Sequence, residues 1–329
     1  MESNIVFIVW ARHSRRAQTL AAELGGHVSF QYEAGLKGRW LTPIRYLAQG
    51  WNTWRALQRA RAATVIVQSP PIFALLVVAV WCAWRKLGGQ HVSYAIDCHT
   101  GTFYDRRWRW ALPLLRLLAH TAVVTLVASE EAQKMLQRWE VNNLFLMDGL
   151  PSFDQPVGMI GTQGTQPVAV ISGFGLDEPV AEILEAARLL PHVTFYFSGD
   201  PQRLPAVMLA QKPGNVVFTG FLQECEYAAL LNNVHGIVNL TTAANILTCG
   251  TYEALAVGKP VVASGHPQMK RYFGRGFIYV RNTPESIAAG ICKMLDERKA
   301  LTEDVLAMRA ELVRRRQPAF EKLAAILQS

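Results

Sequence analysis

The sequence predicts an α/β protein with two domains, each built around a parallel β-sheet flanked by helices. The chain has 329 residues, 50% of them hydrophobic, which is enough to bury two cores in domains of roughly 150 residues each. Short β-branched segments alternate with helix-length segments in both halves, which is the pattern of βαβ units. Residues 152–166 are rich in Pro, Gly, Gln and Thr without periodicity, so we expect a linker there.

In the first half, five segments have the composition of buried strands. They are Ile5–Trp10, Thr64–Ser69, His91–Ile96, Thr121–Ala128 and Asn143–Met147. Helices are expected at Arg15–Leu24, after Ser129 and in the apolar run of residues 72–84. That run is shorter than the roughly 20 residues that span a bilayer, so we interpret it as a core helix.

The second half repeats this alternation. Expected strands are Val168–Ser172, Val193–Ser198, Asn215–Thr219, Gly236–Leu240, Pro260–Ala263 and residues 278–280. Expected helices are Glu178–Leu190, Glu226–Leu231, a segment of about ten residues after Thr248, and most of the chain from Thr283 onward.

The positive charge is concentrated in the first half. The net charge is +8, and residues 1–150 contain 17 Lys and Arg but 9 Asp and Glu, so this half carries the whole excess. Five cysteines, an odd number without metal-type spacing, favour a reducing compartment over a disulfide framework. The first residues lack the basic region and small-residue cleavage site of a signal peptide, so we expect a cytoplasmic protein.

Two segments of the first half combine arginines with aromatic residues. Residues 36–63 interleave five arginines with Trp40, Tyr46, Trp51 and Trp54, and a second such segment starts at Asp105. Long cations and amphipathic rings suit an anionic membrane surface, where the rings lie at headgroup depth. RNA-binding surfaces use the same residue types, and a solvated basic helix is a third interpretation. We expect an anionic membrane surface as partner and no nucleic acid.

Polar residues follow two of the expected strands in the first half. Arg12 and His13 lie in the loop after the first strand, and Asp97 and His99 follow His91–Ile96. Open α/β sheets bind ligands outside the carboxyl ends of their strands. Because a histidine near neutral pH can take a proton from a hydroxyl group, the candidate catalytic residues are Asp97, His99 and His13. A basic surface loop and a strand-end cap are the alternatives.

The stretch Val234–Ser264 has the features of a strand, loop, helix and strand that can hold an anion. The helix is expected to start at Thr248, a good N-cap, and to stop at a Gly-Lys-Pro sequence. The preceding loop is small and polar and Gly250 lies just inside the helix, so backbone N–H groups and the helix dipole can meet a phosphate. Glu253, one turn on, would face neighbouring hydroxyl groups. Since any βαβ unit needs a capped helix, a purely structural role is the alternative.

This stretch resembles the nucleotide-sugar donor site of GT-B glycosyltransferases. The family pattern has two Glu residues separated by seven others, and Glu253 in YEALAVGKPVV matches the second of them. The resemblance implies that Glu253 holds the ribose and that the diphosphate lies near Thr248, Cys249, Gly250 and Thr251. The first Glu, which usually contacts the donor sugar, is replaced here by Asn245, so the donor sugar and the stereochemistry stay open.

The same resemblance implies further donor contacts. The loop Gly173-Phe174-Gly175 would reach the diphosphate, and Phe221 would hold the base through its backbone. Family members usually bring an Arg and a Lys to the glycine loop, whereas this chain has acidic residues there. Cations for the phosphates are therefore sought elsewhere, in Arg12, Lys270 and Arg271. No Asp-x-Asp pair occurs, so we expect no metal ion and no cofactor beyond the nucleotide sugar as co-substrate.

The resemblance also implies two Rossmann-like domains with a cleft between them. The expected parts are an acceptor-side domain (1–151), a linker (152–166), a donor domain (167–316) and a terminal helix (317–329). We expect this helix to turn at Gln317-Pro318 and to pack back on the first domain. The segments VQSPPIFALLVVAVW and AIDCHTGTF are similar to the β-mannosyltransferases that extend chitobiosyl-diphosphodolichol, which implies an acceptor-side role for Asp97 and His99.

Together these features predict a metal-independent glycosyltransferase of the hexosyltransferase type. It would move a sugar from a nucleotide-diphospho-sugar to a lipid-linked or polysaccharide acceptor, at the cytoplasmic face of the membrane. The helix dipole and backbone amides would stabilise the leaving diphosphate. Two alternatives stay open: a catalytically degenerate GT-B protein that binds nucleotide sugar, and a nucleotide-sugar 2-epimerase.

Overall fold

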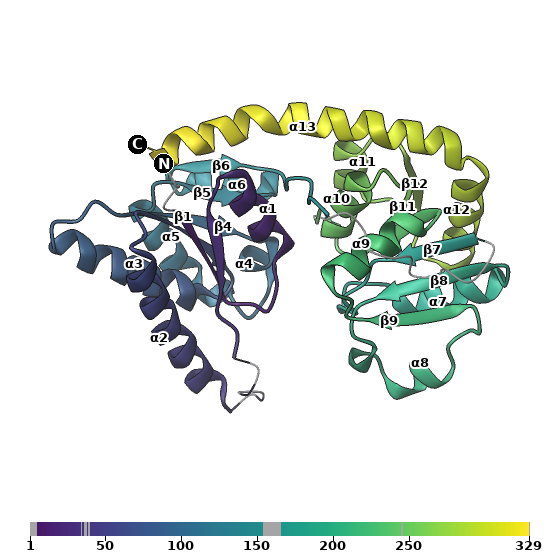
Figure 1. Ribbon diagram of the computed structural model, residues 1–329, viewed down its shortest axis with the longest axis horizontal. Helices are drawn as coiled ribbons and strands as arrows, with labels where there is room; N and C mark the ends of the chain where they lie inside the picture. The colour runs from purple at the N-terminus through teal and green to yellow at the C-terminus, as the bar shows by residue number, and fades with distance from the viewer. Residues whose placement is uncertain are drawn as a thin grey trace. The chain divides into compact units, whose positions relative to one another are not determined.

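The computed structural model describes residues 5–33, 35, 38, 40–153, 166–244 and 246–328. Contacts divide the chain into two compact units (Figure 1). Unit 1 comprises Met1–Gly149 and Arg315–Ser329, and unit 2 comprises Leu150–Arg314. Each unit is built on a parallel sheet of six strands with helices on both of its faces, which confirms the predicted fold class.

The strands of unit 1 lie in the order β2-β1-β3-β4-β5-β6, and all are parallel. They are β1 (Ile5–Val9), β2 (His27–Phe30), β3 (Thr64–Ser69), β4 (Ser93–Cys98), β5 (Thr125–Val127) and β6 (Asn143–Phe145). The helices are α1 (Arg15–Glu23), α2 (Thr42–Ala60), α3 (Ile72–Leu87), α4 (Thr100–Tyr104), α5 (Leu112–Thr121) and α6 (Glu130–Arg138), with a 3-10 turn at Arg109–Ala111.

The core of unit 1 lies on both faces of its sheet. On one face, Leu57, Trp81 and Leu115 from α2, α3 and α5 are fully buried against the strands. The apolar run at 72–84 is thus a core helix, as its length predicts. Leu20 of α1 packs with Leu323 on the other face. No helix in the described part of the chain is long and apolar enough to cross a membrane.

The strands of unit 2 lie in the order β12-β11-β10-β7-β8-β9, again all parallel. They are β7 (Gln166–Val170), β8 (Val193–Ser198), β9 (Val216–Gly220), β10 (Gly236–Asn239), β11 (Val261–Ser264) and β12 (Phe277–Val280). The helices are α7 (Val180–Leu189), α8 (Ala206–Ala210), α9 (Glu224–Asn233), α10 (Cys249–Ala256), α11 (Pro267–Tyr272), α12 (Pro284–Asp296) and α13 (Arg298–Gln328), with a 3-10 turn at Pro201–Arg203.

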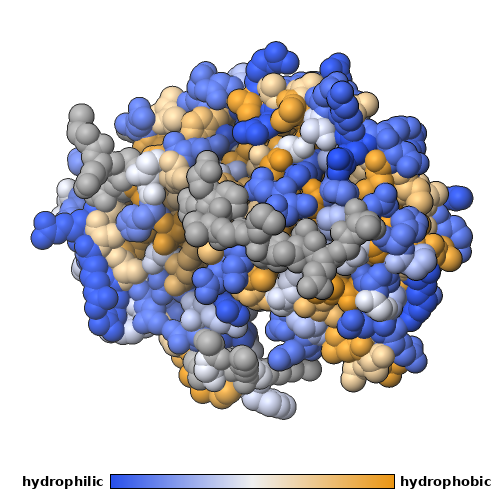
Figure 2. All heavy atoms as spheres, turned by 45° about the vertical axis from the view of Figure 1, so that its right-hand side comes forward, coloured by the Kyte–Doolittle hydropathy of each residue, from blue (hydrophilic) through white to orange (hydrophobic). Residues whose placement is uncertain are grey.

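Strand burial in unit 2 explains its uniformly apolar sequences. A parallel sheet covered on both faces needs apolar residues at consecutive positions, and β10 and β11 are buried along their whole length. The face drawn in Figure 2 shows hydrophilic and hydrophobic residues interspersed, as on an ordinary water-exposed surface. The apolar segments β10 and β11 are therefore buried inside unit 2.

Each sheet has one place where the strand order reverses direction. In unit 1 this point lies between β1 and β3, and in unit 2 it lies between β7 and β10. Loops that leave two neighbouring strands in opposite directions open a crevice at such a point, and α/β proteins bind ligands there. We therefore expect ligand-binding residues in the loops after β1 and β3 in unit 1 and after β7 and β10 in unit 2.

The structure corrects three local predictions. Strand β4 starts and ends later than predicted, so Asp97 lies inside the strand and is not a loop residue. Strand β2 was not predicted, because His27–Phe30 is too short and too polar for a clear signal. The turn expected at Gln317-Pro318 is wrong, since α13 continues through Pro318 and joins unit 1 from residue 315 onward.

Candidate functional site

Hydrogen bonds join the two loops at the reversal point of unit 2. The Thr241 hydroxyl, after β10, donates to Asp177 Oδ2 at 3.2 Å, and the Thr242 N–H donates to the Asp177 carbonyl at 2.6 Å. Gly175 makes room for this carboxylate, because a Cβ at that position would lie 2.8 Å from Asp177 Oδ1. The acidic residue that departs from the family pattern thus ties the two loops together.

Neighbouring side chains occupy the hydrogen-bonding groups of the glycine loop after β7. The Glu178 carboxylate accepts from the Gly173 N–H at 3.0 Å and from the Ser172 hydroxyl. Arg203 donates to the Gly173 carbonyl. A ligand diphosphate that used the Gly173 N–H would therefore have to replace Glu178.

Phe174 has the left-handed backbone conformation that glycine favours, with φ of 54°. Its ring is buried against Phe197 and Phe218. Gly199 allows this close packing at the end of β8, since a Cβ there would lie 2.3 Å from the Ser172 carbonyl oxygen. Phe174 was predicted as a donor contact, but its side chain belongs to the core, so only its backbone faces the loop.

Helix α10 begins at the predicted place but is capped differently. Thr248 is the N-cap residue, and its side chain meets the Thr251 hydroxyl at 2.9 Å without bonding a backbone N–H. Gly250 is buried, and a Cβ there would lie 2.8 Å from the Asn239 side chain. The glycine therefore makes room for Asn239, and the anion contact predicted at Gly250 stays a prediction. Cys249 is exposed at the helix start.

Glu253 is held in place by a partner that the sequence did not indicate. Glu253 is 7% exposed as a residue, and the Tyr227 hydroxyl of α9 donates to its Oε2 at 2.5 Å. Phe153 packs edge-on against the Tyr227 ring at 6.2 Å. Phe221, the predicted base contact, precedes α9 and is 64% exposed. Helix α9 thus links the loop of Phe221 to the carboxylate of Glu253.

The predicted phosphate cations have different surroundings. Lys270 and Arg271 lie in α11, and of these two only Lys270 lines a pocket, which is described below. Arg12 is exposed in the loop after β1 of unit 1. Asn245 lies outside the described residues. No group of three His, Cys, Asp or Glu side chains clusters in a metal-binding arrangement within the described ranges.

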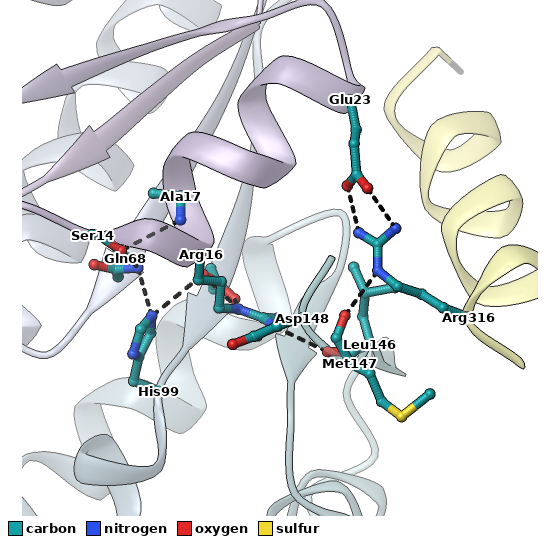
Figure 3. A network of polar contacts seen from close by, with 11 residues as sticks. Ser14, Arg16, Ala17, Glu23, Gln68, His99, Leu146, Met147, Asp148 and Arg316 are labelled. Atoms are coloured by element: carbon teal, nitrogen blue, oxygen red, sulfur yellow. Dashed lines mark hydrogen bonds and ion pairs between the residues drawn. The ribbon is translucent and has the colours of Figure 1, made fainter. Parts of the chain in front are cut away.

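A buried charge network underlies the reversal point of unit 1 (Figure 3). Arg16 Nε donates to both carboxylate oxygens of Asp97, at 2.8 and 3.1 Å. Arg16 Nη1 donates to the Leu146 carbonyl at 3.1 Å and pairs with Asp148. Burial would raise the pKa of Asp97, but the Arg16 guanidinium outweighs it and holds this pKa well below its ordinary value.

This network separates the roles of the two candidate catalytic residues at β4. Asp97 is 1% exposed and paired, so it cannot touch a substrate in this arrangement, and its low pKa makes it a weak base. The His99 side chain is 35% exposed at the carboxyl edge of the sheet. Of the pair predicted from the sequence, His99 is the group that a substrate can reach.

Gln68 lies beside the His99 ring (Figure 3), and Asp97 lies near the same ring nitrogen. The Gln68 amide nitrogen lies 2.5 Å from His99 Nε2 and donates to the Ser14 hydroxyl at 2.9 Å. Because Gln68 and Asp97 both lie at Nε2, a substrate proton can be accepted at Nδ1 only in the tautomer that carries the ring proton on Nε2. Asp97 Oδ2 lies 3.7 Å from the same nitrogen. His13, the third candidate, is exposed beside this cluster in the chain and stacks on Phe30 at 6.4 Å.

Comparison with known proteins shows what this geometry is similar to. Residues 175–297 match the family model described as glycosyl transferases group 1. The chain is similar to Anabaena Alr3699/HepE, solved in complex with UDP and glucose, with a TM-score of 0.69, 14% identity, and coverage of 99% of this chain and 100% of the other. Both the fold and the domain match agree with the resemblance seen in the sequence.

The chain has the GT-B fold, and part of its unit 2 is similar to glycosyl transferases group 1. A sucrose-phosphate synthase from Thermosynechococcus elongatus is similar in structure, with a TM-score of 0.67, 12% sequence identity and 98% of each chain covered. A protein described as a putative UDP-N-acetylglucosamine 2-epimerase from Listeria monocytogenes is also similar. Its TM-score is 0.59 and its sequence identity is 10%, with 93% of this chain and 91% of the other covered. No curated protein sequence matches the chain significantly. At these identities the structural likeness establishes the GT-B fold alone.

Proposed function

We propose that the protein transfers a hexosyl group from a nucleotide-diphospho-sugar to an acceptor hydroxyl without a metal ion. The observation that carries this proposal is the buried Glu253 carboxylate, fixed by Tyr227 one turn inside the helix that starts at the reversal point of unit 2. A fixed carboxylate accepts hydrogen bonds from ribose hydroxyls, and the N-terminal end of α10 favours the adjoining diphosphate.

On the acceptor side, unit 1 presents His99. In the proposed reaction the acceptor oxygen forms a bond to the anomeric carbon while the bond from that carbon to the diphosphate oxygen breaks. His99 takes the proton of the acceptor hydroxyl, and the nucleoside diphosphate leaves with the bonding electron pair. Asp97 acts as a positioning residue, because its negative charge behind the ring favours the imidazolium that forms.

The acceptor is proposed to be lipid-linked, with unit 1 binding an anionic membrane surface. Apolar residues at helical spacing are exposed along α2 and along its neighbour α3, namely Ile44, Leu47, Trp51, Leu76, Val80, Trp84 and Leu87. Trp54 and Trp84 join the two helices, with ring centroids 5.5 Å apart. Helix α2 also contains three arginines, and α3 ends with Arg85 and Lys86, so this helix pair has the composition of an interfacial membrane-binding surface.

A thermal-shift screen tests the donor half of this proposal. Purified protein is heated with UDP, GDP, ADP and dTDP sugars, and a ligand that binds only the folded state raises the melting temperature. We expect a shift with one nucleotide class that is lost in Glu253→Ala. If no nucleotide sugar shifts the melting temperature, the proposed donor site is wrong.

A product assay then separates transfer from the alternatives. With the donor found in the screen, mass spectrometry of an added polyprenyl-diphosphate-linked sugar should show a mass gain of one hexose. Conversion of the donor to its 2-epimer without an acceptor would identify an epimerase instead. Donor binding without either product would identify a protein that only binds nucleotide sugar.

A further inference from the structure

A polar pocket of about 450 Å³ lies in unit 2 at the carboxyl ends of β11 and β12. Its lining residues come from the loop after β11, from α11 and from the segment that leads into α12. They include Ser264, His266, Lys270, Tyr279, Arg281 and Asn282. Two of these are permanent cations, and no Asp or Glu lines the pocket among the described residues.

Among the residues that the structure describes, Lys270 has no carboxylate partner in the pocket. Its ammonium lies 5.8 Å from the centroid of the Tyr279 ring. The Tyr279 hydroxyl donates to the Met269 carbonyl at 2.9 Å, which fixes the ring. A cation that rests on an aromatic ring keeps its N–H donors available for a ligand.

Arg281 adds the second charge at the end of β12. Within the part of the chain that the structure describes, neither Lys270 nor Arg281 forms an ion pair. The Arg281 N–H donates to the Ser286 hydroxyl at 3.1 Å, so this residue is tied to the first turn of α12. The N-terminal end of this thirteen-residue helix adds a partial positive charge to the pocket.

The neutral wall of the pocket is rigid and connects it to the loops at the reversal point. His266 Nε2 donates to the Thr241 carbonyl at 2.8 Å, and Asn282 Nδ2 donates to the same oxygen at 2.9 Å. The Ser264 hydroxyl donates to Asn282 Oδ1 at 2.7 Å. Thr241 itself bonds Asp177 across the reversal point. Hydrogen bonds therefore fix the shape of the pocket and connect its wall to the loops of the proposed donor site.

We propose that this pocket binds a phosphoryl group. Two unpaired cations and a helix N-terminal end match the double negative charge of a phosphate, and its oxygens accept from ammonium and guanidinium donors. The pocket has room for a phosphate ester larger than the free ion. Binding itself does not depend on the proposed transferase reaction. Only the source of the phosphoryl group does, since it can belong to the donor or to a phosphate-bearing second substrate.

Titration calorimetry with inorganic phosphate at constant ionic strength tests the pocket in the full chain. Lys270→Ala and Arg281→Ala should each weaken phosphate binding about tenfold, and the double variant should abolish it. Arg275→Ala is the matched control, because Arg275 is an exposed cation of the same unit that does not line the pocket. Each of the three side chains is exposed, so the variants are expected to keep the melting temperature of the parent protein. Phosphate binding that is unchanged in the double variant, or equally weakened in Arg275→Ala, overturns the proposal.

A competition experiment identifies the source of the phosphoryl group. If UDP displaces phosphate, the pocket holds a phosphate of the nucleotide donor. If phosphate binds equally well to UDP-saturated protein, the pocket serves the other substrate. The variant Glu253→Ala should keep its phosphate binding in either case, so a failed donor site and a failed phosphate pocket give different results.

Discussion

Replacing Asp97 by Asn should destabilise unit 1 strongly, although only one charge is removed. Arg16 is buried, and its Nε donates to the two Asp97 oxygens. Asn keeps the shape but loses the charge, which leaves the guanidinium only partly compensated. Removing one partner of a buried pair destabilises by about 3–5 kcal/mol, and the remaining contact with Asp148 places this case near the lower end.

The assay is thermal unfolding followed by circular dichroism, with scanning calorimetry to check the number of transitions. A loss of about 3 kcal/mol should lower the melting temperature of a unit of this size by roughly 6–12 °C. Asp105→Asn is the control, because Asp105 pairs with Arg107, whose side chain is 83% exposed. Such a surface pair contributes less than about 1 kcal/mol. Equal melting temperatures for the two variants would refute the role assigned to the buried network.

The pH dependence gives a second test of the same pair. The pKa of Asp97 is lower in the folded than in the unfolded protein, so the paired carboxylate stabilises the fold above the unfolded pKa, near 4. This contribution is lost as the pH falls below that value toward the folded pKa. The difference in melting temperature between the parent protein and Asp97→Asn should therefore be constant near neutral pH and shrink in acid. A difference that grows in acid would contradict the sign of the shift.

Three further predictions concern the proposed function. His99→Ala should lower the rate constant of transfer about 10²–10⁴-fold without changing donor binding, whereas His91→Ala, at the opposite end of β4, should be neutral. Tyr227→Phe should raise the dissociation constant of the nucleotide sugar about tenfold, measured by calorimetry, because the Glu253 carboxylate loses its fixed orientation. An unchanged dissociation constant would show that the Tyr227 contact does not contribute to donor binding. Leu47→Glu should reduce sedimentation with anionic vesicles several-fold, since this residue is 75% exposed, while Leu306→Glu in α13 should not.

The sequence predicted the fold well because both sheets are parallel and doubly covered. Their strands are short, uniformly apolar segments that end at glycines or polar residues, and Thr64–Ser69 and Val193–Ser198 were predicted with the observed bounds. Strand β2 lacked this signal because its residues are only partly buried at the sheet edge. Pro318 suggested a helix end, but tertiary packing of the following residues keeps α13 helical beyond it.

The candidate site was predictable only where a motif carried it. Glu253 and Thr248 follow from the local strand, loop and helix pattern. Tyr227 and Arg16 could not be found, because each meets its carboxylate partner through a contact distant in the chain. Arg281 was missed for a similar reason, since only the pairing of β12 with β11 brings it to the pocket of Lys270.

The final turns of α13 have a consequence for how the chain reaches its folded state. Arg316 donates to the Met147 carbonyl at 2.9 Å and forms a two-point ion pair with Glu23, while Leu323 and Leu327 complete the apolar layer over α1. These residues are synthesised after the whole of unit 2. On the ribosome, one face of the sheet in the first 149 residues therefore stays incompletely covered until residues 315–329 have been synthesised and can pack against it.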